Sequence, residues 1–427
     1  MTPTVVFDTF GIVSNETGSV VPTAYMLALV VMVFTAVSYG RMTRIFPSAG
    51  SSYTYTSATI SPNVGFLIGW AALLDYLLLP LVNALIIRSY MYSFFPEVPP
   101  WIWVTIYVVA ITAMCLFSMT NTSRVNMLLV VFEVVLIAVF LVLAFKSLQD
   151  GMGNGTLFST KPLWHDGVHL NLVITGATIV AFSFIGFDAI TMYTEEAKDT
   201  STVPKAIVLA LMIGGAIFFI SAWFTQSLFP DISSFNEESL RNSALPQIAF
   251  MVGGHIFKIL LSPRRSRPPW LRASPRMLRF RACSSSWGGM AEVRSVVSSG
   301  SCIRVSRRRP TRSSSSAWCR SWRSPSIWTS WLPLINFGAL IAFTFVNLTV
   351  IVYFAYRRRE INGARQIFRN IVLPAIGMAF TIPLWAYLSA DSTRYGIIWF
   401  AIGIAVLLWI TRFFRQPLTI NMGEAHG

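Results

Sequence analysis

The sequence predicts an all-α, polytopic membrane protein, and three observations lead to this prediction. Only 12% of the 427 residues are charged and 54% are hydrophobic, whereas a soluble domain usually carries about 25% charged residues. Apolar runs of the roughly 20 residues needed to cross a bilayer recur along the chain. Lysine and arginine gather in alternate connections between these runs. Because the bilayer core holds no water to hydrate the backbone, the runs must be helices.

Successive apolar runs set the expected spans. Residues 1–13 are too short to cross a bilayer. Pro80 falls inside the second full span and is expected to kink it, because proline removes a helical hydrogen bond. A further apolar run opens near Ala249 and stops at Leu261. The full spans expected, in chain order, are 21–39, 64–92, 101–117, 128–145, 170–191, 206–229, 334–356, 371–388 and 397–410.

The charges between the spans predict the orientation, because cytoplasmic loops carry an excess of Lys and Arg. Acidic residues, among them Glu97, Asp231 and Asp391, fall mostly on the side opposite to the basic ones. The sequence therefore predicts a multi-pass protein of the bacterial inner membrane with a cytoplasmic C-terminus. The basic residues on the predicted cytoplasmic side are Arg41, Arg44, Arg124, Lys198, Lys205, Arg357, Arg358, Arg359, Arg412 and Arg415.

Residues 262–331 do not fit this pattern. They include 15 arginines, no lysine, six tryptophans and a single acid, Glu292, so most of the net charge of +15 lies within them. A disordered basic loop or a nucleic-acid-binding segment would mix in lysine, glycine and acids and contain few tryptophans. The composition instead favours a third interpretation, translation of a GC-rich gene in the wrong frame. We therefore expect no nucleic-acid partner.

The genetic code offers a check on this interpretation. Met277, Trp287 and Met290 anchor a reading shifted by one base. The shifted reading permits the completion of one apolar helix, then a basic loop, then a second apolar helix. We expect the chain to be organised as residues 1–261 and 332–427, separated by a segment, 262–331, that is not a native domain.

The sequence predicts neither an enzyme nor a cofactor or metal site. Three of the four cysteines lie in 262–331, and Cys115 stands alone in an apolar run, so no disulfide framework is indicated. No nucleophile–base pair is evident in the expected spans. The histidines are scattered at His165, His169, His255 and His426.

Several strings resemble the amino acid–polyamine–organocation superfamily of permeases. Residues 46–55 (FPSAGSSYTY) resemble its signature between helices 2 and 3. Residues 184–188 (FIGFD), followed by Glu195 and Glu196, resemble its broken sixth helix. Residues 334–338 (LINFG) resemble the start of its tenth helix. The resemblance covers nearly the whole chain except the anomalous stretch.

Within the superfamily, the closest likeness is to bacterial putrescine importers, through residues 1–7 (MTPTVVF) and 74–76 (LDY). The resemblance implies 12 helices, in which two inverted five-helix repeats are followed by two further helices. The solute would bind at mid-membrane, where helices 1 and 6 unwind. Residues 1–4 would match the unwound part of helix 1, so helix 1 is expected to be truncated. Helices 8 and 9 are expected to fall in the garbled stretch.

Carboxylates inside the spans are the strongest site candidates, because intramembrane charges usually face a cavity or the bundle interior. Asp188 stands at the expected helix break beside Gly186, where it could contact a solute or coupling ion, or cap a helix. Asp75 could contact a solute or make a buried structural hydrogen bond, and Glu133 could pair with a neighbouring helix. The solute-binding candidates are Pro3, Thr4, Asp8, Asp75, Tyr76, Phe184, Gly186, Phe187 and Asp188. The proton-coupling candidates are Asp75, Glu133, Asp188 and Glu195.

Aromatic residues near these acids could form one wall of a site. Phe184, Phe187 and Tyr76 are the candidates for such a wall, and packing in the core is the alternative for each. Tyr53 and Tyr55 are expected to hold the short connection between two helices rather than to touch a solute.

The excess of interior acids favours a cationic solute or a proton. A polyamine has two or more ammonium groups and no carboxylate, so it would need acids near its ends and aromatic faces along its length. The leading hypothesis is secondary active, proton-coupled uptake of putrescine or a related polyamine. One alternative is an amino-acid permease or exchanger, whose solute carries a carboxylate. A less favoured alternative is a non-transporting membrane protein.

Overall fold

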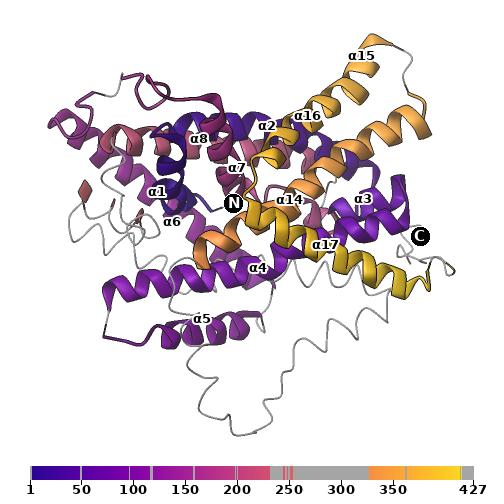
Figure 1. Cartoon of the computed structure of the whole chain (residues 1–427), viewed down its shortest axis with the longest axis horizontal. Coiled ribbons are helices and arrows are strands. Elements are labelled where there is room, and N and C mark those ends of the chain that lie inside the picture. Colours follow the sequence, from indigo (N-terminus) through magenta and orange to yellow (C-terminus); the bar gives the residue numbers. More distant parts are fainter. Residues whose placement is uncertain are drawn as a thin grey trace, which may run out of the picture.

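A computed structural model of the chain is built from helices (Figure 1). No strand occurs among the residues that it describes. The structure describes residues 2–48, 51–95, 97–115, 119–156, 159–197, 199, 201–230, 244–245, 248, 251–252, 327–360, 363–413 and 415.

The helices follow one another with short connections through most of the described part. The α-helices are α1 (Val5–Thr17), α2 (Val21–Ile45), α3 (Ser51–Thr59), α4 (Pro62–Phe94), α5 (Pro100–Cys115), α6 (Met119–Gln149), α7 (Leu170–Phe184), α8 (Thr202–Leu228), α14 (Ile327–Ile351), α15 (Ala364–Ile367), α16 (Leu373–Ala386) and α17 (Ala390–Ile410). A 3-10 helix, η1 (Asp188–Glu196), follows α7, and two π-helical stretches, η3 (Val352–Arg357) and η4 (Phe368–Val372), adjoin α14 and α16.

Eight helices in the described part are long and apolar enough to cross a bilayer. They coincide with eight of the expected full spans, which confirms the prediction of an all-α, polytopic membrane protein. The remaining full span, 101–117, corresponds to α5, a shorter apolar helix. The described residues do not by themselves test the expected count of 12 helices.

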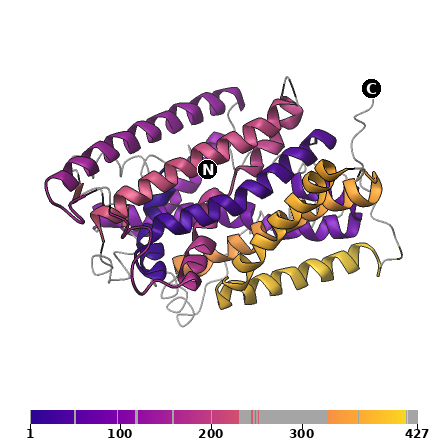
Figure 2. The ribbon, with the colours of Figure 1, turned by 90° about the horizontal axis from the view of Figure 1, so that it is seen from above.

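Helix α2 lies at the centre of the bundle. It packs against α7 and α8 on one side and against α14 and α16 on the other. Figure 2 shows the resulting row, in which α6 and α8 lie to one side of α2 and the orange helices and yellow α17 to the other. The buried side chains of α2, such as Tyr25 and Tyr39 with no exposed surface, belong to the main hydrophobic core.

Helix α4 is one continuous element despite Pro80 in its interior. It begins at Ser61, whose side chain accepts a hydrogen bond from the Val64 N–H at 3.3 Å. Because Pro80 has no N–H, the carbonyl of Tyr76 one turn earlier loses its helical donor. The Tyr107 hydroxyl of α5 donates to the Pro80 carbonyl at 3.3 Å, which ties α5 to this point of α4.

The chain breaks between α7 and η1, where the sequence predicted a broken helix. Helix α7 ends at Phe184, and η1 begins at Asp188 with tighter 3-10 winding. Gly186 in the break has φ +111°, a conformation that side chains with a Cβ rarely adopt. Glycine at this position is therefore what allows the chain to change direction.

The expected anomalous segment 262–331 lies outside the described residues, apart from residues 327–331. Those five positions open α14, which begins at Ile327 rather than at the expected residue 334. The apolar run 249–261 also lies outside the described residues, apart from Met251 and Val252. The proposed division of the chain at 262–331 stays a prediction.

Candidate functional site

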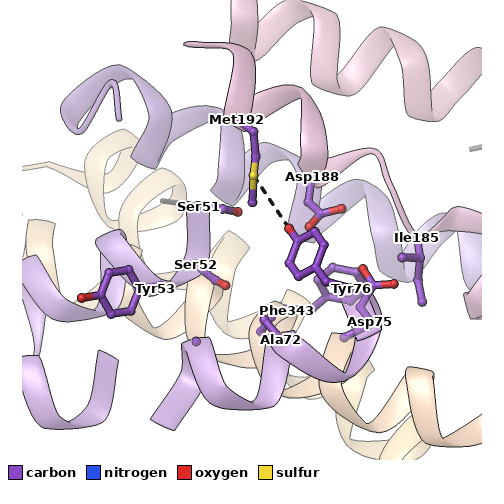
Figure 3. Close-up of a pocket in the computed structure, with 13 residues that line it drawn as sticks. Ser51, Ser52, Tyr53, Ala72, Asp75, Tyr76, Ile185, Asp188, Met192 and Phe343 are labelled. Atoms are coloured by element: carbon purple, nitrogen blue, oxygen red, sulfur yellow. Dashed lines mark hydrogen bonds between the residues drawn. The ribbon is translucent and has the colours of Figure 1, made fainter. Parts of the chain in front are cut away.

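One internal cavity gathers residues from three parts of the chain that are distant in sequence, namely the neighbouring helices α3 and α4, the α7–η1 break with η1, and α14 (Figure 3). Helices α3, α4 and α14 supply three walls, and the α7–η1 break with η1 supplies the fourth. The cavity is lined by Ser51, Ser52, Tyr53, Gly69, Ala72, Asp75, Tyr76, Ile185, Asp188, Met192, Ala339, Ala342 and Phe343.

Helix α4 presents one face to this cavity. Gly69, Ala72 and Asp75 follow one another at intervals of three, and Tyr76 lies four positions after Ala72, so all four lie on one side of the helix. Gly69 and Ala72 have small side chains and so leave room for the cavity. Asp75 contributes a carboxylate and is only 7% exposed. Helical periodicity thus places an acid and a phenol side by side on one cavity wall.

Asp188 is held by the break that precedes η1. The Gly186 N–H donates to the Asp188 Oδ1 at 3.2 Å, and the Thr191 hydroxyl donates to the Asp188 carbonyl at 2.6 Å. The carboxylate lines the cavity and accepts its hydrogen bond from the break rather than from a helical N–H of η1, whose N-cap is Phe187 without a side-chain capping bond. Figure 3 shows Asp75 and Asp188 on one side of the cavity and Ser51 and Ser52 across from them.

Aromatic and sulfur-containing side chains complete the lining. The Tyr76 hydroxyl points to Met192 Sδ at 3.9 Å, which links α4 to η1 (Figure 3). Phe343 of α14 supplies an aromatic face, and Phe187 stacks behind it with ring centroids 5.4 Å apart. Tyr53, which we expected only to hold a connection, lines the cavity as well.

The cavity is small in this conformation. Its enclosed space is ≈ 20 Å³, which is on the scale of a single water molecule. A solute with several carbon atoms therefore does not fit until the surrounding helices move apart. We call this narrow conformation of the cavity closed.

The acids in the cavity lining have no described basic neighbour within it. These acids are Asp75 and Asp188. Burying a carboxylate is costly unless a cation or a proton compensates the charge. The arrangement favours binding of a cation, with one ammonium group near each acid, or of a cation and a proton.

Of the other carboxylate candidates, Asp8 and Glu133 are not among the residues that line this cavity. Asp8 on α1 accepts a hydrogen bond from the Tyr90 hydroxyl at 2.5 Å. Tyr90 lies 15 residues beyond Asp75 on α4, about 22 Å along the axis. Glu133 on α6 is 2% exposed and is not among the lining residues. Glu195 belongs to η1, but its side chain lies outside what the structure describes.

Of the three aromatic residues expected to form a wall, only Tyr76 lines this cavity. Phe184 is fully buried, and its ring packs edge-on against Phe218 of α8 with centroids 5.4 Å apart, away from the cavity. Phe187 lies behind the lining rather than in it. Neither Pro3 nor Thr4 lines the cavity, and Thr4 forms the N-cap of α1.

Sequence reasoning missed the contributions of α3 and α14. Ser51 and Ser52 belong to the string 46–55, and their hydroxyl groups are the sequence signal for a polar lining on this side of the cavity. Ala339, Ala342 and Phe343 share a helix face by their spacing of three and four, directly after the quoted string 334–338. That spacing was the signal that could have identified this wall.

Comparisons with known proteins place the chain among transport proteins. The family model for amino acid permeases matches residues 1–264. The low-affinity putrescine importer PlaP of Escherichia coli (strain K12) is 38% identical over 445 residues, covering 98% of this chain and 92% of that protein. The branched-chain amino acid permease BcaP of Lactococcus lactis is 22% identical over 423 residues, covering 90% and 85%. The gamma-aminobutyric acid permease of Escherichia coli is 26% identical over 218 residues, covering 50% and 46%.

Proposed function

The chain belongs to the amino acid permease family, and on that premise we propose that it imports putrescine or a related polyamine through the cavity between α3, α4, η1 and α14. As a family member it is a secondary transporter and a multi-pass membrane protein, not an enzyme. The identity of the solute and of the coupling ion is the proposed part.

The observation that carries the proposal is the pair of acids in one cavity. Asp75 and Asp188 come from different elements and face the same space without a basic residue among its described lining. Putrescine has an ammonium group at each end and no carboxylate, so its charges complement such a site. The aromatic faces of Tyr53, Tyr76 and Phe343 would contact its charged ends or methylene chain.

The alternative solute is an amino acid, as the names of the more distant relatives suggest. Its carboxylate would need free backbone N–H groups or a basic side chain in the site. The Gly186 N–H already donates to Asp188, and the two cavity acids would repel a carboxylate. The geometry therefore supports a polyamine better than an amino acid.

We also propose that import is driven by proton symport. When no solute is bound, a proton on Asp75 or Asp188 would reduce the charge of the closed cavity, because uncompensated buried charge is unfavourable. Exchange of that proton between the two sides would couple it to the solute. Opening of the closed cavity is proposed to follow the rocking of the helix bundle that the resemblance implies.

The membrane orientation and the organisation of the chain complete the proposal. Loop charge supports a cytoplasmic C-terminus in the bacterial inner membrane.

The match to the family model ends at residue 264, close to the start of the segment 262–331 that we attribute to a shifted reading frame. Resequencing the DNA across this stretch tests that idea, and a trace without two compensating frame changes would disprove it.

Transport in proteoliposomes tests the solute. The frame-restored chain is reconstituted and uptake of radiolabelled putrescine is followed with an acidic outside and a neutral inside. We expect uptake that is competed by unlabelled putrescine and abolished when a protonophore collapses the pH gradient. Uptake of neutral amino acids without competition by polyamines would refute the proposed solute, and uptake independent of the pH gradient would refute the proton.

A further inference from the structure

A second hollow lies on the surface of the bundle, between α2, α8 and the junction of η4 with α16. Its volume is ≈ 660 Å³, and none of its lining residues lines the central cavity. We call it the basic groove. Its lining residues are Val37, Gly40, Arg41, Arg44, Pro204, Lys205, Val208, Leu209, Met212, Arg369 and Leu373.

Close packing of α2 on α8 forms part of the groove. A Cβ atom added to Gly40 would lie 3.1 Å from the Pro204 Cβ, so the two helices approach each other closely there. The groove is thus built into the helix packing, and does not depend on the position of one flexible side chain.

Four cations from three elements converge on the groove. Arg41 and Arg44 come from α2, Lys205 from α8 and Arg369 from η4. The Arg41 guanidinium is half-buried, donates to the Arg369 carbonyl and lies 6.0 Å from the Phe354 ring centroid. Arg44, Lys205 and Arg369 are exposed. Arg41 is therefore fixed in place, while the other three remain accessible to a ligand.

These cations are not neutralised by the residues around them. No acid is among the described residues that line the groove. Asp199 interacts electrostatically with Lys205, but its carboxylate accepts hydrogen bonds from the Ser201 N–H at 2.8 Å and the Ser201 hydroxyl at 2.7 Å. One acid against four cations leaves the groove strongly positive.

The rest of the groove is apolar and faces outward. Leu209 is 60% exposed and Met212 is 46% exposed on the surface of α8, which is one of the membrane-spanning helices. Val37, Val208 and Leu373 continue this apolar surface. A positive end joined to an apolar wall matches a molecule with an anionic head and a hydrocarbon tail.

We propose that the basic groove binds an anionic phospholipid, with the headgroup phosphate on Arg44, Lys205 and Arg369 and an acyl chain along Leu209 and Met212. Basic pockets between membrane helices on the cytoplasmic side suit such headgroups, and the proposed orientation places this end of α2 on that side. The bound lipid bridges α2, α8 and η4. This site is independent of the proposed solute.

Lipid binding is measured directly on the full chain in detergent. The frame-restored chain, which contains α2, α8 and α16 unchanged, is titrated with dioleoyl-phosphatidylglycerol or dioleoyl-phosphatidylcholine, and bound lipid is counted by native mass spectrometry. We expect tighter binding of phosphatidylglycerol. The variant Arg44→Gln/Arg369→Gln should bind it about 30-fold more weakly, on the basis of the typical contribution of each cation near an anionic headgroup.

A matched variant controls for net charge. Arg359→Gln/Arg365→Gln removes two exposed cations near the same end of the bundle, neither of which lines the groove, and should bind phosphatidylglycerol as the parent does. Equal losses in both variants, or equal binding of the two lipids, would overturn the proposal. Displacement of the lipid by inorganic phosphate at millimolar concentration would show a free-anion site instead, and would also overturn it.

Discussion

The phenol of Tyr90 on α4 donates a hydrogen bond to the carboxylate of Asp8 on α1, across 82 positions of sequence. Both side chains are buried, Asp8 with 6% and Tyr90 with 2% of its surface exposed. The contact joins the first described helix to the far half of α4. The carboxylate of Asp8, which the sequence suggested as a solute contact, thus takes part in a hydrogen bond between two helices.

Tyr90→Phe is expected to destabilise the chain by about 1–3 kcal/mol, because it removes a donor from a buried carboxylate. The measurement is the thermal midpoint of the frame-restored chain in detergent. Tyr92→Phe is the control, since Tyr92 lies on the same helix and is 53% exposed. If Asp8 acts mainly on the solute, Tyr90→Phe will leave the midpoint unchanged and Asp8→Asn will raise the KM for putrescine.

Asp75→Asn and Asp188→Asn are each expected to weaken putrescine binding by about 30-fold or more, because each removes one partner of a desolvated charge pair. The measurement is the KM of uptake together with the amount of chain inserted in the membrane. Asp391→Asn, an exposed acid in the first turn of α17, is the matched control. Wild-type KM in both cavity variants would show that the solute binds elsewhere.

Gly186→Ala is expected to reduce transport, because φ +111° is strained by of order 1–3 kcal/mol for a residue with a Cβ. The strain should shift the backbone that donates to Asp188. Gly155→Ala is the control for strain itself, since Gly155 also has a positive φ, +64°, and open space around it. Similar loss of uptake in both variants would mean that stability, not the geometry of the break, limits transport.

Gly338→Ala is expected to destabilise the junction of α14 with α4 by about 1–3 kcal/mol. An added Cβ would lie 2.4 Å from the Ala71 carbonyl oxygen, so one helix must move. Because Ala72 and Ala339 adjoin this contact and line the cavity, uptake should fall as well. Gly363→Ala, with no atom within 4 Å of the added Cβ, should change neither quantity.

Much of the fold could be predicted because the requirement that a membrane-spanning helix be apolar applies to consecutive residues. A helix that crosses lipid must be apolar along its length, so the span 170–191 could be identified from consecutive residues, whereas the break at Gly186 was expected from the resemblance of residues 184–188 to the permease superfamily. The site was harder to predict, because which interior acids meet depends on helix packing. Asp75 and Asp188 line the same cavity, whereas Asp8 accepts a hydrogen bond from Tyr90. In the sequence all three are carboxylates in apolar runs, and each is a candidate for contact with the solute.

The aromatic wall illustrates the same limit. Phe184 and Phe187 flank the break in sequence, yet the change of direction at Gly186 turns Phe184 toward α8 and places Phe187 behind the lining. Besides Tyr53 and Tyr76, the aromatic lining includes Phe343, more than 150 residues later in the chain. No local pattern links these positions. Only the packing of α14 against α4 brings Phe343 to the site.

The wall formed by Ala339, Ala342 and Phe343 has a consequence for biosynthesis. During synthesis, Asp75 and Asp188 enter the membrane long before the ribosome reaches this wall, so for that interval no α14 covers them. If a shift of the reading frame ended translation before residue 339, the carboxylates of Asp75 and Asp188 would be left next to lipid. Each would cost about 2.5–3.5 kcal/mol of insertion free energy near mid-bilayer. Such a nascent product should be recognised by membrane proteases, so the two acids of the cavity would also report an unfinished chain.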